Sequence, residues 1–99
     1  MNNPAFTSRG IKKKATTYEK NGEEIIFRLY HTNIVTIRPH EVILDSGGYR
    51  TMTTKRRINQ ILEEYDIPYK LSNIRGRWVV TGTKFDAGGY FQDGMKLTY

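Results

Sequence analysis

One short stretch of the chain gathers side chains that bind anions. Its cations and hydroxyls lie within eight residues: Arg50, Thr51, Thr53, Thr54, Lys55, Arg56 and Arg57. Guanidinium, ammonium and hydroxyl groups all donate hydrogen bonds to phosphate oxygens. We therefore predict that these donors converge on a phosphate group.

The same stretch opens the one helix that the sequence predicts, at about residues 54–65. Its apolar side chains recur at i, i+3, i+4 and i+7 and form a single stripe: Ile58, Ile61, Leu62 and Tyr65. Thr53 or Thr54 is expected to cap the N-terminus, and Pro68 is expected to stop the helix. The anion-binding side chains therefore lie at a helix start, where free backbone N–H groups also favour an anion.

The charges along this helix are placed against its dipole. Lys55, Arg56 and Arg57 occupy the first turn, where the N–H groups already carry partial positive charge. Glu63 and Glu64 lie near its end, and no cation of the helix has an acid at i+3 or i+4. Each exposed misplaced charge costs about 0.3–1 kcal/mol, which favours a function for the cations. The alternative, that they pair with acids elsewhere in the fold, stays open.

The net charge of +6 comes from the first part of the chain. Residues 1–57 hold eleven Lys and Arg against five acids, whereas residues 58–99 hold five of each. A one-sided positive field suits a polyanion, which is a nucleic acid, an anionic membrane surface or an acidic protein patch. Lys12, Lys13 and Lys14 add a basic run that is either a phosphate contact or a solvated run of charge.

Aromatic and basic residues are neighbours at several points of the sequence. Alternation along a strand places such neighbours on opposite faces, so the two do not share one site within a strand. Tyr49 and Tyr90 are the aromatic residues expected to be exposed, and exposed rings stack on bases. Trp78 alternates with Val80 and is expected in the core. No RNP-type RNA-binding motif is present.

Patterns typical of catalysis and metal binding are missing from the sequence. There is no cysteine, and the two histidines, His31 and His40, lie nine residues apart, which is no recognised ligand spacing. Gly47 and Gly48 belong to no G-x-x-x-x-G-K-[ST] phosphate loop and predict a turn with positive φ. We therefore expect no enzymatic activity, no metal and no cofactor.

The strongest hairpin signal is the dipeptide Asn21-Gly22. A symmetric two-residue turn at this dipeptide would set Lys20 opposite Glu23 and Tyr18 opposite Ile25. The opposite charges of the first pair agree with this register. The sequence therefore predicts a first hairpin with this pairing.

The expected fold is a single α+β domain at residues 13–99, preceded by a flexible tail at residues 1–12. The strands are expected at residues 15–20, 23–30, 33–38, 41–44, 69–74 and 77–81. Their tight connections predict an antiparallel sheet of hairpins or a meander, which the amphipathic helix covers on one face. Residues 85–99 are expected to form a further hairpin or an extended tail. Because an exposed edge strand can pair two copies, a monomer or a homodimer is expected.

The run from His31 to Val80 resembles a family of small proteins found in bacteriophages and related mobile elements. The resemblance rests on Leu44 to Asn59, which reads L-x-S-G-G-Y-R-T-x-T-T-K-x-R-I-N. It extends to the flanking groups Tyr30-His31-Thr32, Ile34, Trp78-Val79-Val80 and Phe91-Gln92-Asp93-Gly94. It implies a phage-type origin and a compact sheet-plus-helix unit, and it supplies no mechanism.

Two hypotheses for the function follow from these observations. The first is a non-enzymatic accessory protein of phage type that binds nucleic acid, or a nucleic-acid-bound complex, through the basic N-terminal half and the helix start. The alternative is a protein that binds and inhibits a host defence system, such as a CRISPR nuclease. No signal peptide and no membrane span are apparent, so we expect the protein in the cytoplasm of an infected bacterium.

Overall fold

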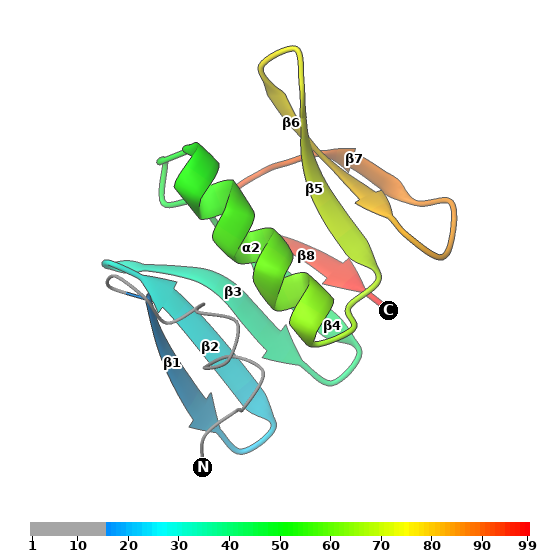
Figure 1. Cartoon of the computed structure of the whole chain (residues 1–99). Helices are drawn as coiled ribbons and strands as arrows, with labels where there is room; N and C mark the ends of the chain where they lie inside the picture. The colour runs from blue at the N-terminus through cyan, green and yellow to red at the C-terminus, as the bar shows by residue number, and fades with distance from the viewer. Residues whose placement is uncertain (1–15) are drawn as a thin grey trace.

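The computed structural model of the protein describes residues 16–99 (Figure 1). The expected tail and the basic run Lys12, Lys13 and Lys14 lie outside the described residues. Within residues 16–99 the chain forms eight strands and one helix. Their order is β1 (Thr16–Asn21), β2 (Glu24–Leu29), β3 (Thr32–Arg38), β4 (Glu41–Leu44), α2 (Met52–Glu64), β5 (Tyr69–Ile74), β6 (Arg77–Gly82), β7 (Gly88–Tyr90) and β8 (Met95–Thr98).

The strands form two antiparallel sheets instead of one. The larger sheet has five strands in the order β1-β2-β3-β4-β8, and the smaller sheet has three in the order β5-β6-β7. The expected class, a small antiparallel α+β fold with one described helix, is confirmed. The second sheet arises because the chain leaves β4 through the helix and does not return to the first sheet until β8 (Figure 1).

The last fifteen residues form neither the expected hairpin nor an extended tail. β7 pairs with β6 of the small sheet, and β8 pairs with β4 of the large one. Phe91 lies between these two strands and is buried, with its ring centroid 5.3 Å from that of Trp78. Burial of the Phe91 ring favours this crossing, because the segment between β7 and β8 places an apolar side chain in the common core.

The first hairpin has a different register from the expected one. Lys20 lies opposite Ile25 and Tyr18 opposite Phe27, so the predicted pairs of Lys20 with Glu23 and of Tyr18 with Ile25 are wrong. The loop residues are Gly22 and Glu23, and Gly22 has a φ of 61°. This register sets the Tyr18 ring 5.4 Å from the fully buried ring of Phe27, a contact that outweighs one exposed charge pair.

The helix begins two residues before the predicted start. Thr51 is the N-cap, and its hydroxyl accepts a hydrogen bond from the Thr54 N–H at 3.2 Å, so the expected cap at Thr53 or Thr54 is wrong. Thr51 has the extended backbone that an N-cap needs, with a φ of −97° and a ψ of 163°. The helix ends at Glu64, ahead of Pro68.

The helix packs against both sheets through its apolar stripe (Figure 1). Its most extensive contacts are with β5 of the small sheet and β3 of the large sheet. Ile58, Ile61 and Leu62 are buried as predicted, and Tyr65 is half-buried with its ring 5.5 Å from that of Phe27. The expected core position of Trp78 is confirmed by its 4% exposure. No helix within residues 16–99 combines the length and apolarity needed to cross a bilayer.

Candidate functional site

A turn with two glycines leads from β4 into the helix. Gly47 and Gly48 have φ angles of 63° and 84°, which confirms the predicted turn. A Cβ on Gly47 would lie only 2.2 Å from the Thr32 hydroxyl oxygen, so the turn also packs closely against the start of β3. The Asp45 carboxylate accepts a hydrogen bond from the Gly47 N–H at 2.7 Å. These contacts fix where the segment that follows the turn begins.

Asp93, from the C-terminal segment, fastens this turn from the other side. Its Oδ1 accepts hydrogen bonds from the Ser46 N–H at 2.8 Å and from the Ser46 hydroxyl at 2.6 Å. Burial acts to raise the pKa of the Asp93 carboxyl, but the hydrogen bonds from Ser46 and the positive charge of Arg50 outweigh it. The pKa therefore lies below its usual value, and Asp93 is held as a carboxylate at neutral pH.

Several hydrogen-bonding groups at the helix start are already bonded to one another. The Thr54 hydroxyl lies 3.1 Å from the Thr51 hydroxyl, and Thr54 is only 4% exposed. The Thr51 hydroxyl in turn accepts from the Thr54 N–H, and the Lys55 N–H donates to the Thr51 carbonyl. The N–H groups of Met52 and Thr53 come before the first intrahelical bond, so they point out of the helix start without an acceptor in the helix.

Residues 49–55 separate two hollows. Tyr49, Thr51, Thr53 and Thr54 face one hollow of 540 Å³, and its other lining residues are Leu29, Tyr30, His31, Thr32, Ile34 and Ser46. We call this hollow the aromatic pocket, because Tyr30 and Tyr49 are its large exposed side chains. Its lining contains no Lys, Arg, Asp or Glu.

The hollow on the other side of residues 49–55 is lined by cations. It has a volume of 530 Å³, and its lining residues are Arg50, Met52, Lys55, Lys70, Leu71, Ser72, Asn73 and Trp78. We call it the cationic groove, because three of these side chains are positively charged and none is acidic. The Arg50 guanidinium lies 5.1 Å from the centre of the Phe91 ring, a cation–π contact that holds it beside the small sheet.

The structure does not bring all these predicted donors together around one hollow. The structure brings Arg50 and Lys55 together and places the hydroxyls of Thr51, Thr53 and Thr54 in the other hollow. The reason is the early helix start at Met52, because successive residues of a helix point about 100° apart and cannot all face one point.

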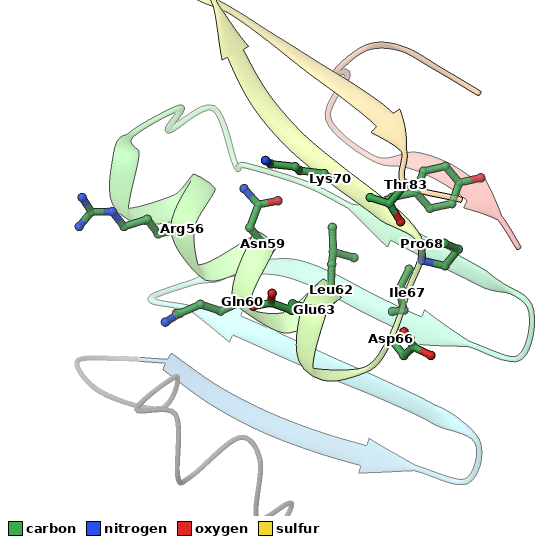
Figure 2. A pocket seen from close by; sticks show the side chains of 11 residues that line it. Arg56, Asn59, Gln60, Leu62, Glu63, Asp66, Ile67, Pro68, Lys70 and Thr83 are labelled. Carbon is green, nitrogen blue, oxygen red and sulfur yellow. The ribbon is translucent and has the colours of Figure 1, made fainter. Parts of the chain in front are cut away.

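Arg56 and Arg57 also point away from the cationic groove. Arg56 borders a third hollow, of 520 Å³, which runs between the helix and β5 and also contains the acids Glu63 and Asp66. Figure 2 shows that its side chain extends outward, away from the other labelled residues. Arg57 donates to the Thr16 hydroxyl at 3.3 Å and to the Gln60 amide oxygen at 3.2 Å, so it serves the fold.

The alternative that the helix cations pair with acids is not supported within residues 16–99. Arg50, Lys55, Arg56 and Arg57 lie within 4.0 Å of no described carboxylate. The ion pairs of the described chain involve other cations, with Arg38 bridging Glu24 and Glu41 as the closest example. Lys55 and Arg56 are therefore available to an external anion, whereas Arg57 bonds within the fold and Arg50 lies in the field of Asp93.

Sequence reasoning missed two residues that border these hollows. Lys70 completes the cationic groove, and Tyr30 forms part of the aromatic pocket with an exposure of 66%. Tyr30 directly follows β2, in the turn before β3, and has a positive φ of 56°, which no sequence pattern marks in a tyrosine. Lys70 could be found only from the packing of β5 beside the helix. Tyr49 and Tyr90 are 69% and 62% exposed.

Metal-ligating side chains do not cluster in the described part of the chain. No three His, Asp or Glu side chains of residues 16–99 come together as a group that could hold a metal ion. His31 lines the aromatic pocket, while the other histidine, His40, has a φ of 65° in the turn between β3 and β4. The site consequently offers hydrogen-bond donors, aromatic rings and positive charge.

The fold and the site define a small antiparallel α+β protein with a cationic groove beside an aromatic pocket. The model of a family described as Kyanoviridae Gp96 protein matches residues 1–98. The chain therefore belongs to this family of bacteriophage proteins, and the predicted bacteriophage origin is confirmed. The specific motif from Leu44 to Asn59 stays a prediction. No curated protein and no solved structure matches the chain significantly.

Proposed function

We propose that this phage protein is a non-enzymatic accessory protein that binds nucleic acid through the cationic groove. The observation that carries the proposal is the meeting of Arg50, Lys55 and Lys70 around one hollow without an acid in its lining. Three cations from the turn, the helix and β5 produce a positive potential that a phosphate backbone would neutralise. The side chains of Ser72 and Asn73 in the same lining supply further polar groups.

The cationic groove is a better candidate than the hollow beside Arg56. That hollow also contains Lys70, but Glu63 and Asp66 in its lining cancel the positive charge. Asn59 borders this hollow as well (Figure 2). Its amide is engaged by the backbone of Leu71. Arg56 is therefore expected to add weak electrostatic attraction, while Lys55 and Lys70 make direct phosphate contacts. Lys12, Lys13 and Lys14 would extend the positive field.

The salt dependence of binding tests this proposal. Binding to labelled single- and double-stranded DNA and RNA would be measured by fluorescence anisotropy between 50 and 200 mM salt, values that span the usual steep range. The test variant is Lys55→Gln/Lys70→Gln. The matched control is Lys20→Gln/Lys84→Gln, which removes the same charge at exposed positions outside the groove. Circular dichroism would check that both variants are folded.

The expected results distinguish direct contacts with phosphates from non-specific electrostatic attraction. Each lost phosphate contact lowers the slope of log K against log salt by about 0.9 on duplex DNA and about 0.7 on a single strand. The test variant should therefore lose about two contacts, and the control should keep the slope of the wild type. Equal losses in both variants would show that the groove has no special role. If no nucleic acid binds even at 50 mM salt, the proposal fails, and the protein-binding inhibitor becomes the hypothesis to pursue.

A further inference from the structure

We propose that the aromatic pocket holds an unstacked base of a single strand whose phosphates lie in the cationic groove. This inference rests on the proposed function and deepens it, because it names single-stranded nucleic acid as the ligand. The pocket combines an apolar floor with a ring of polar and aromatic groups. Leu29 and Ile34 are 6% and 1% exposed at its base, while Thr51 and Thr53 present polar groups at the helix start.

The two tyrosines of the pocket expose their rings without a stacking partner. Within residues 16–99, Tyr30 and Tyr49 contact no other ring and no cation, although they are 66% and 69% exposed. Tyr90 is different, because the Arg77 guanidinium lies 4.9 Å from the centre of its ring and already covers one face. A large exposed ring is unfavourable in water, and a nucleobase supplies the flat apolar face that would cover it.

The segment that carries Tyr49 is held firmly before any ligand arrives. Gly47 packs against Thr32, and Asp93 accepts two hydrogen bonds from Ser46, which itself lines the pocket. A backbone segment fixed in advance loses less conformational entropy when its side chain stacks, so more of the stacking energy appears as affinity. The backbone that carries Tyr49 is therefore positioned without a ligand.

The relation between the two hollows identifies the occupant as a nucleotide. Tyr49 faces the aromatic pocket and the next residue, Arg50, faces the cationic groove. A strand that crosses residues 49–55 can thus place a base on one side and its phosphates on the other. The pocket lining contains no Lys, Arg, Asp or Glu, which suits a neutral base, and the groove lining is positive, which suits the backbone. Bases in a duplex are paired and stacked, so a single strand is required.

The test compares strands that carry the same phosphates with and without bases. The probes are a labelled single strand, an abasic strand of equal length and a duplex, at one fixed salt concentration. Wild type should bind the ordinary strand at least about fivefold more tightly than the abasic strand, since one stacked base contributes that much or more. Tyr49→Leu should abolish this preference, and Tyr49→Phe should keep it, because stacking uses the ring face. Tyr90→Leu is the matched control, with similar exposure outside the pocket, and should change nothing.

The outcomes distinguish this inference from the proposed function. If the ordinary and abasic strands bind equally and Lys55→Gln/Lys70→Gln weakens both, the groove binds phosphate and the base pocket is rejected. If Tyr49→Leu and Tyr90→Leu weaken binding alike, stacking lies elsewhere and the pocket is likewise rejected. If no strand binds at all, the proposed function and this inference fail together. A base preference that survives in Lys55→Gln/Lys70→Gln and disappears in Tyr49→Leu supports the pocket directly.

Discussion

The side-chain amide of Asn59 forms two hydrogen bonds with the backbone of Leu71. Its Nδ2 donates to the Leu71 carbonyl oxygen, and its Oδ1 accepts from the Leu71 N–H, each at 2.8 Å. β5 is the edge strand of the small sheet on this side, so these two backbone groups have no strand partner. The amide of a helix residue thus takes the place of a neighbouring strand and fastens the helix to the small sheet.

Replacement of Asn59 should loosen this connection. We expect Asn59→Leu to lower the free energy of unfolding by about 1–3 kcal/mol, because a buried N–H and C=O lose their partners. Asn33→Leu is the matched control, since its amide bonds only to the exposed Arg28 side chain. Urea unfolding followed by circular dichroism measures both variants. Equal stability of Asn59→Leu and wild type would contradict the structural role assigned to the amide.

Gly47 should be less replaceable than the adjacent Gly48. Both have positive φ, so alanine at either position costs about 1–2 kcal/mol in backbone strain. At Gly47 the added methyl group also meets the Thr32 side chain at 2.2 Å, whereas at Gly48 it meets nothing within 4 Å. We therefore expect Gly47→Ala to lose about 1–3 kcal/mol more than Gly48→Ala in urea unfolding. A similar loss in the two variants would mean that the contact with Thr32 relaxes freely.

The sequence predicted the elements better than it predicted their arrangement. The apolar stripe of the helix, the turn at Gly47 and the strand Glu41–Leu44 depend on local spacing and were placed correctly. The division into two sheets depends on which strand β8 pairs with. The sequence pattern of a single strand does not specify its neighbouring strand. The register of the first hairpin was wrong because burial of Phe27 against Tyr18 overrides the charge pair expected beside the turn.

The candidate site was predicted only in part, for a similar reason. The unpaired cations at the helix start could be recognised from the sequence, because helix dipoles and i, i+4 spacing are local. Which hollow each side chain faces depends on the helix phase, and the cap at Thr51 sets that phase. Lys70 and Tyr30 join the two hollows through tertiary packing, which no short motif encodes.

Asp93 should make stability depend on pH in the acid range. Its pKa is lower in the folded protein than in the unfolded chain, so the carboxylate stabilises the fold above the unfolded value of about 3.9. That contribution is lost as the pH falls through the lower folded pKa. We expect Asp93→Asn to lose about 1 kcal/mol at pH 7 and to approach wild type as the pH falls below the folded pKa of Asp93. Urea unfolding at several pH values measures this difference, with the exposed Asp86→Asn as control. A difference that does not change with pH would exclude the charge of Asp93 as its cause.

Lys55 should strengthen binding to nucleic acid and lower the stability of the helix. The first turn contains no acid, and a cation near the helix N-terminus opposes the dipole. We expect Lys55→Glu to raise the free energy of unfolding by about 0.5 kcal/mol, which is about 2–4 °C in Tm for a domain of this size. The same change should weaken binding to nucleic acid more than Lys20→Glu does, because Lys55 lines the cationic groove and Lys20 does not. Thermal unfolding and anisotropy at one salt concentration measure the two effects together. If Lys55→Glu instead lowers stability, Lys55 supports the fold, and its placement against the dipole is no argument for a function.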